Sequence, residues 1–238
     1  MSYSKLILNI PHSSIVDYDA GWNGKYKMFP IVKKWTDWHT NLLFNNDDKK
    51  LNIKSCVFGY SRFFCDAERL INDPLEHVGQ GIIYRKFCGL TREPSDELIY
   101  KAMSAYDAYH LNMANSVEEN TCLVDCHSFP EELAKHVDVC IGFNEDNSKP
   151  SEEVLNTVTS IFTDNGYNVD WNSPYQNSVV PKAQLPCSSF MIEVNKKTYM
   201  DEKTLELYPT KFDFLHKIIN HVYLYLLTGE RHDSRATI

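Results

Sequence analysis

The segment Lys5-Leu6-Ile7-Leu8-Asn9-Ile10-Pro11-His12-Ser13-Ser14 indicates the fold class more clearly than any other stretch of the chain. Its continuous apolar, β-branched part is typical of a strand buried on both faces, as in a sheet covered by helices. Proline and histidine then end the run abruptly. Comparable apolar runs at 53–59, 121–125, 137–143 and 189–194 predict further buried strands.

Between these runs, apolar residues recur at the spacing of amphipathic helices. Ser151 is expected to cap one helix, with acidic side chains in its first turn. Pro209 is expected to interrupt or kink the last helix. The alternation predicts an α/β fold: a single three-layer domain over residues 1–238, with a central mixed, largely parallel sheet flanked by helices. The helices are predicted over 28–44, 94–117, 151–165 and 203–227.

The composition of the 238 residues, 43% hydrophobic and 13% aromatic, is that of a globular protein and excludes intrinsic disorder. The net charge of −8 offers no basic surface for nucleic acid or an anionic membrane. No apolar stretch approaches the ~20 residues that span a bilayer, and we expect no secretory signal. The 7 cysteines include no Cys-x-x-Cys pair, which argues against a disulfide framework. We therefore predict a reduced, cytoplasmic protein, and its oligomeric state stays open.

Polar side chains interrupt or follow several of the predicted strands. His12 and His127 each come after an apolar run, and Glu193 lies inside one. Two histidines and one carboxylate form a typical ligand set for a catalytic zinc ion. A carboxylate buried in a hydrophobic strand is costly unless it has a partner or a role, such as that of a general base. Arg62 and Arg69 follow the second run and suit an anionic substrate.

Each of these residues also has a purely structural interpretation. A single histidine after a strand is commonly a hydrogen-bonded structural residue. Glu193 could pair with Lys196 or Lys197, and Arg69 could form an internal salt bridge with Asp66. The chain contains no compact metal-binding motif such as His-Glu-x-x-His, so spacing alone leaves the two interpretations open.

Taken in order, eight stretches resemble the N-formylglutamate amidohydrolase family, whose members are related in fold to zinc carboxypeptidases and aspartoacylase. The resemblance extends from residue 6 to about residue 195. The matching stretches are 10–14, 35–38, 61–62 with 66–69, 79–84, 106–110, 124–128, 172–175 and 192–194.

The resemblance implies a zinc-carboxypeptidase-like domain that uses one Zn²⁺ per chain to cleave the amide bond of an N-formyl or other N-acyl amino acid. His12 and His127 match the two histidine ligands of the metal. Zinc carboxypeptidases place a glutamate ligand three residues after the first histidine, where this chain has Ile15. Asp37 is the third ligand that we predict. Asp66 and Glu68 are the alternatives.

The resemblance also assigns the remaining site residues. Glu193 matches the general base, Arg62 the group that polarises the carbonyl, and Arg69 the anchor for a substrate carboxylate. Glu68 and Tyr175 are expected to contribute to substrate binding. Many relatives have Asp-x-Asn-Arg where this chain has the sequence Asp-Ala-Glu-Arg at 66–69, so a substrate other than N-formylglutamate is an open alternative.

Two other classes of protein compete with this hypothesis. A non-catalytic binding protein for a small carboxylate, without metal, would explain Ile15 and Glu68. A cysteine hydrolase would use Cys126 beside His127. Neighbouring residues of a strand point to opposite faces, so this pair is poorly placed for catalysis.

Overall fold

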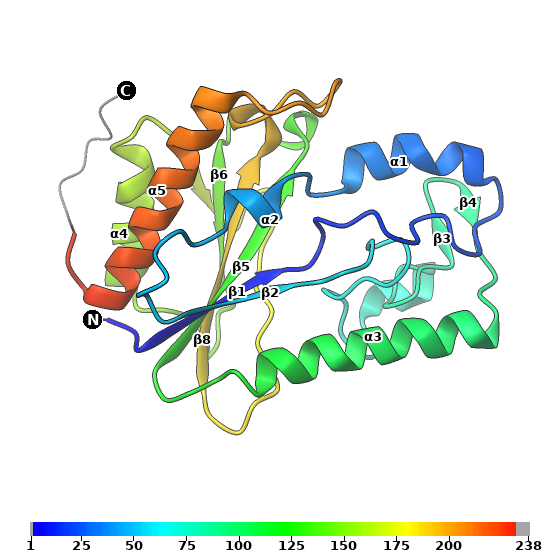
Figure 1. Ribbon diagram of the computed structural model, residues 1–238, viewed down its shortest axis with the longest axis horizontal. Coiled ribbons are helices and arrows are strands. Elements are labelled where there is room, and N and C mark those ends of the chain that lie inside the picture. The colour runs from blue at the N-terminus through cyan, green and yellow to red at the C-terminus, as the bar shows by residue number, and fades with distance from the viewer. Residues whose placement is uncertain (1, 232–238) are drawn as a thin grey trace.

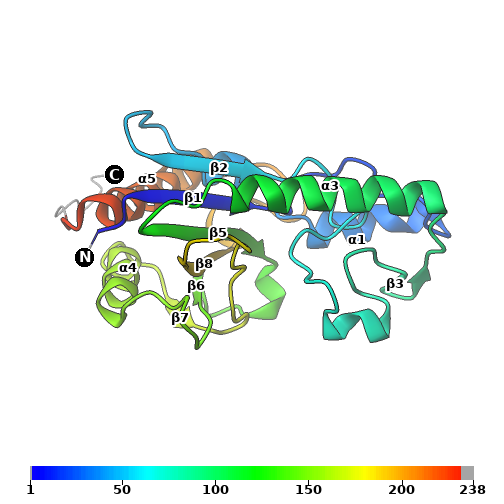
Figure 2. The same cartoon turned by 90° about the horizontal axis from the view of Figure 1, so that it is seen from below.

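The centre of the molecule is a six-stranded sheet with the order β2-β1-β5-β8-β6-β7, which can be followed from one edge to the other in Figure 2. The structure is a computed structural model, and it describes residues 2–231. β2, β1, β5 and β8 are parallel, whereas β6 and β7 run antiparallel to them. The predicted mixed, largely parallel sheet is therefore confirmed. Its strands are β1 (Lys5–Ile10), β2 (Ile53–Val57), β5 (Thr121–Phe129), β6 (Val139–Gly142), β7 (Val169–Trp171) and β8 (Cys187–Asn195).

Helices cover both faces of this sheet (Figure 1). α4 (Glu152–Thr163) and α5 (Pro209–Thr228) pack on one face, and α3 (Asp96–Ala114) packs on the other. Alternate residues of β1 enter the two cores: Leu6 and Leu8 face α4 and α5, and Ile7 faces α3. Among residues 2–231, no helix is both long enough and apolar enough to cross a membrane.

A lobe extends beyond the carboxyl ends of β1 and β2, to the right of the sheet in Figure 1. It contains α1 (Met28–Trp35), the short helix η2 (Pro74–Val78) and the hairpin of β3 (Lys86–Phe87) and β4 (Leu90–Thr91). An aromatic and aliphatic cluster holds the lobe together, with Trp22, Met28, Val32, Phe63 and Tyr84 at its centre. The lobe thereby places the residues between β2 and α3 next to the carboxyl ends of the parallel strands.

Several predicted boundaries are wrong. The helix expected over 28–44 is two helices, α1 and α2 (Thr40–Leu43), because the chain leaves the helical conformation at Thr36 and His39 has a φ of 64°. α5 begins at Pro209 instead of bending there, since proline is well suited to the first turn of a helix. β5 continues to Phe129 because its last residues still pair with β8. β7 and the β3–β4 hairpin were not predicted.

The amino terminus of α4 allows a direct test of the predicted cap. The Ser151 hydroxyl accepts a hydrogen bond from the backbone N–H of Val154 at 3.3 Å. We expect Ser151→Ala to lower the free energy of unfolding by about 1 kcal/mol, because that N–H loses its partner. Urea unfolding would measure the change. Ser160→Ala in the same helix is the control and should have a smaller effect, since Ser160 only bonds back to the Asn156 carbonyl.

Candidate active site

All eight residues predicted to form the site line one cavity of about 460 Å³ at the carboxyl ends of the parallel strands. A wider depression of about 710 Å³ lies around Lys197 and Tyr208, and none of the predicted site residues lines it. The structure therefore brings together residues that are widely separated in the sequence. They are His12, Asp37, Arg62, Glu68, Arg69, His127, Tyr175 and Glu193.

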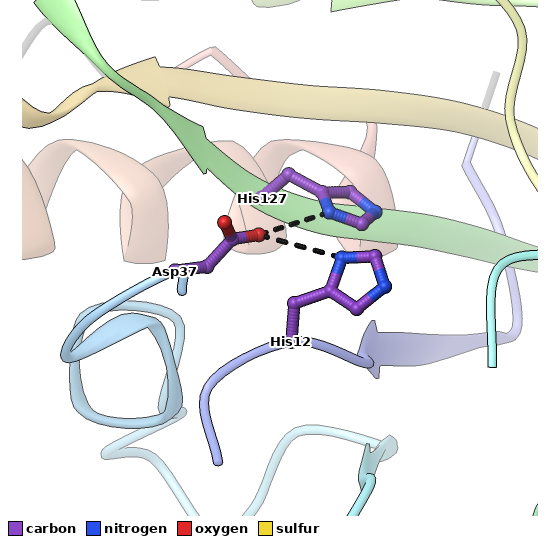
Figure 3. Close-up of side chains that lie close together, drawn as sticks. All are labelled: His12, Asp37 and His127. Atoms are coloured by element: carbon purple, nitrogen blue, oxygen red, sulfur yellow. Dashed lines mark hydrogen bonds and ion pairs between the residues drawn. The ribbon is translucent and has the colours of Figure 1, made fainter. Parts of the chain in front are cut away.

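Two histidines and an aspartate that line this cavity point towards one another (Figure 3). His12 follows β1 and His127 lies in the neighbouring strand β5, so their rings are 5.2 Å apart. Asp37 Oδ2 lies 3.1 Å from Nδ1 of His127 and 3.7 Å from Nδ1 of His12. The backbone N–H of Asp37 also donates to the His12 carbonyl at 3.1 Å. One ligand atom from each residue thus faces the same point.

The opposite nitrogen of each ring contacts a second carboxylate. His12 Nε2 lies 2.7 Å from Asp66 Oδ1, and His127 Nε2 lies 2.9 Å from Asp125 Oδ1. An ionised carboxylate only accepts hydrogen bonds, so each Nε2 carries a proton, and a neutral ring would present the lone pair of its Nδ1 towards Asp37. Metal-binding histidines are typically oriented by such an outer carboxylate.

This arrangement leaves acceptors facing one another. His12 Nδ1 is buried and has no hydrogen-bond partner among the described residues. His127 Nδ1 faces the Asp37 carboxylate, and two acceptors in contact require a proton or a cation between them. Burial lowers the pKa of His127, but Asp125 and Asp37 outweigh this effect and raise it well above its usual value. The donor set therefore fits a divalent metal ion that takes the place of this proton.

Asp37 owes its position to the break between α1 and α2. The last carbonyls of a helix need partners from outside the helix. Lys196 Nζ donates to the Lys34 carbonyl at 2.6 Å, and the Tyr199 hydroxyl donates to the Trp38 carbonyl at 2.7 Å. Burial would raise the pKa of Asp37, but the two histidines hold it well below its usual range. Asp37 is thus ionised. Hydrogen bonds to the carbonyls of Lys34 and Trp38 fix the chain on either side of it.

Asp66 connects the histidine site to the two arginines. Its Oδ2 accepts from Arg62 Nη2 at 3.2 Å and from the Tyr84 hydroxyl, and lies 3.6 Å from Arg69 Nε. Burial would raise the pKa of Asp66, but Arg62, His12 and Arg69 hold it well below its usual value. The internal Asp66–Arg69 ion pair considered from the sequence is therefore present, and Arg69 lines the cavity as well.

Glu193 lies in β8 directly beside His127 of β5. Its side chain is buried, and this burial, with Asp37 adding to it, raises the pKa of Glu193 to about 8. Neither lysine considered as its partner forms that ion pair. Lys196 donates to a backbone carbonyl, and Lys197 Nζ pairs with Asp138 at 3.1 Å. The structural alternative for Glu193 is therefore wrong.

Glu68 and Asp66, the alternatives for the third ligand, lie on the far side of the histidine rings from Asp37. Glu68 Oε1 is 3.8 Å from His127 Nε2 and accepts a hydrogen bond from Asn9 Nδ2 at 2.7 Å. Burial and the neighbouring Asp125 raise the pKa of Glu68 to about 8. Of these three carboxylates, Asp37 lies on the Nδ1 side of both rings, whereas Glu68 groups with Asp125 and His127 on the Nε2 side, where a metal ion could also be held.

The sequence patterns did not single out several residues that support this site. Asn9 Nδ2 bridges Glu68 and Asp125, and its Oδ1 accepts from the Tyr109 hydroxyl at 2.5 Å. Asn9 and Asp125 lie in buried strands that are otherwise largely apolar. A polar residue inside a buried strand is costly without a partner, and this could have indicated a role for both. Tyr84 lies in the matching stretch 79–84, but a tyrosine in a loop does not by itself indicate a role.

Comparisons with known proteins bear on this fold and site. A model of the N-formylglutamate amidohydrolase family matches residues 4–200. The crystal structure of N-formylglutamate amidohydrolase from Ralstonia eutropha JMP134 is similar with a TM-score of 0.75 and 17% identity, over 97% of this chain and 96% of that chain. The crystal structure of gene product Atu2144 from Agrobacterium tumefaciens is similar with a TM-score of 0.60 and 15% identity, over 94% and 92%. No curated protein sequence matches the chain.

The family model covers most of the chain, including every residue that lines the cavity. The structural similarity independently supports the fold over nearly the whole length. The chain therefore belongs to the N-formylglutamate amidohydrolase family, a family of hydrolases that act on carbon–nitrogen bonds.

Proposed function

We propose that this protein is a metal-dependent amidohydrolase that cleaves an N-formyl or other N-acyl amino acid. One Zn²⁺ per chain would be held by His12, Asp37 and His127. The observation that supports this most is that Nδ1 of both histidines faces the Asp37 carboxylate, and that the buried Nδ1 of His12 has no hydrogen-bond partner among the described residues. Zinc commonly takes two imidazoles and one carboxylate and keeps a further position open.

Zinc bound there would supply Lewis-acid polarisation of the scissile carbonyl and a water of lowered pKa. Residues of the chain would carry out proton transfer, stabilisation of the developing charge and substrate binding. Glu193 takes a proton from the attacking water and delivers it to the leaving amine, a task suited to a carboxylate whose pKa is about 8. Arg62 stabilises the negative charge that develops on the carbonyl oxygen. Arg69 binds the substrate carboxylate and orients the amide bond, with Glu68 and Tyr175 at the cavity wall.

The geometry favours this proposal over the two alternatives, a non-catalytic binding protein and a cysteine hydrolase. Ile15, the residue that suggested loss of the metal, is 38% exposed and does not line the cavity, and Asp37 completes the ligand set without it. Cys126 points into the core beneath α4 and α5, where burial raises the pKa of its thiol well above the usual value. A thiolate nucleophile at this position is therefore disfavoured.

Metal analysis tests the proposal directly. Protein purified without added metal or chelator should contain close to one zinc per chain, and His12→Ala should lose it, because one of three ligands is removed. His136→Ala is the matched control, since His136 is exposed and lies outside the cavity. Chelation should abolish hydrolysis of N-acyl amino acids and zinc should restore it. A metal-free, chelator-insensitive protein that binds these compounds would instead be the non-catalytic binding protein.

A further inference from the structure

We infer that the substrate is an N-acyl amino acid with a single carboxylate and an aromatic or long aliphatic side chain, in preference to a dicarboxylate such as N-formylglutamate. This inference rests on the proposed function and specifies its substrate class. Two independent features of the cavity support it: the charges of its lining residues and the chemistry of its walls.

Each cation of the cavity already contacts an oxygen atom of the chain, although Nε of each arginine has no hydrogen-bond partner among the described residues. Among the described residues, its lining contains three basic side chains: Arg62, Arg69 and Lys196. Asp66 contacts both guanidinium groups, and Arg69 Nη1 also lies 4.0 Å from Asp73. Lys196 is 1% exposed and donates to a backbone carbonyl. The arginines can still receive one carboxylate through their remaining N–H groups. The described lining contains no further arginine or lysine that could bind a second carboxylate.

Carboxyl groups also lie around the cavity. Asp37, Glu68 and Glu193 line it, and Asp66 and Asp125 lie in contact with the histidines. A second carboxylate on the substrate would lose its water without gaining a lysine or arginine partner in the described lining, whereas an uncharged side chain avoids that cost.

Apolar side chains from two separate clusters also line the cavity. In one cluster Phe87 stacks on Tyr84 at 5.4 Å and contacts Trp35 edge to face at 5.9 Å. Tyr175 and Met191 lie among the other lining residues. A flat or long apolar group gains contact area between such surfaces, and aromatic rings also gain from stacking or edge contacts.

Tyr84 links the two parts of the proposed subsite. Its hydroxyl donates to Asp66, the carboxylate that holds Arg62 and Arg69, while its ring stacks on Phe87. The carboxylate anchor and the aromatic wall are thus adjacent. An amino acid carries its α-carboxylate and its side chain on the same carbon, and this adjacency matches that arrangement.

Competing substrates test the inference. With zinc-loaded protein, kcat/KM for N-formyl-L-phenylalanine should exceed that for N-formyl-L-glutamate by about 10- to 100-fold. Phe87→Ala should reduce this preference at least several-fold, and Tyr26→Ala is the matched control, because Tyr26 is 81% exposed and lies outside the cavity. Gln80→Arg provides a second variant, which adds a cation to the lining and leaves the aromatic wall intact. It should raise the rate for N-formyl-L-glutamate relative to N-formyl-L-phenylalanine.

The outcomes separate this inference from the proposed function. Metal-dependent hydrolysis with equal or greater kcat/KM for N-formyl-L-glutamate would overturn the inference and leave the function standing. Hydrolysis of neither compound, and of neither N-acetyl counterpart, by zinc-loaded protein would overturn the function. In that case calorimetric titration of the same two compounds decides the inference: tighter binding of N-formyl-L-phenylalanine supports it, and tighter binding of N-formyl-L-glutamate, or of neither, overturns it.

Discussion

Replacement of Glu193 by glutamine is expected to lower kcat/KM for amide hydrolysis by about 10²- to 10⁴-fold, the usual contribution of a general base. Glutamine has nearly the same shape but cannot accept a proton. Because Glu193 is not among the proposed ligands, the variant should still bind close to one zinc per chain. Steady-state kinetics combined with metal analysis measure both quantities.

The pH dependence of the same variant gives an independent readout. A general base acts in its ionised form, so kcat/KM should rise with pH through the pKa of Glu193 and then level off. Burial raises this pKa to about 8, and a bound divalent cation would favour the carboxylate and shift the rise to lower pH. The rise should disappear in Glu193→Gln. Glu131→Gln, at an exposed position outside the cavity, should keep wild-type activity and the wild-type profile. A zinc-loaded Glu193→Gln protein with full activity would exclude the mechanism.

Asp66→Asn is expected to lower the free energy of unfolding by about 3–5 kcal/mol, the usual range for breaking a buried ion pair by removing one partner. Asp66 is completely buried and contacts His12, Arg62, Arg69 and Tyr84. The neutral amide leaves two guanidinium groups facing each other without the anion between them. Urea unfolding at pH 7 would measure the loss. Asp73→Asn is a suitable control, because asparagine preserves the hydrogen bond that Asp73 accepts from Leu75 N–H.

The difference in the free energy of unfolding between the wild type and Asp66→Asn should also depend on pH. The pKa of Asp66 in the folded protein lies well below its usual value, and an unfolded aspartate titrates near ~3.9. A lowered folded-state pKa contributes stability that is fully present above the unfolded pKa and is lost as the pH falls through the folded pKa. The wild type and Asp66→Asn should therefore differ most near neutral pH and converge below about pH 4. A difference that stays constant or grows in acid would contradict this assignment.

Local sequence determined much of the fold. Buried strands are continuous apolar runs, and the runs at Lys5–Ile10 and within Cys187–Asn195 indicate strands without any knowledge of their neighbours. The cap of α4 is equally local, because a serine followed by two glutamates satisfies and stabilises the first turn by itself. The placement of His12 and Glu193 near one another also followed, since residues at the carboxyl ends of parallel strands share one edge of a sheet.

The tertiary structure alone decided where the helix expected over 28–44 would break. The apolar spacing continues through this segment, so the pattern predicts one helix. Lys196 and Tyr199, distant in the sequence, supply the hydrogen bonds that allow the chain to leave the helix and turn Asp37 towards the histidines. Likewise, only the three-dimensional structure shows that Asp66 and Asp125 contact the outer faces of the histidines. Periodicity records which side of an element is apolar, whereas these roles depend on partners that only the folded chain brings together.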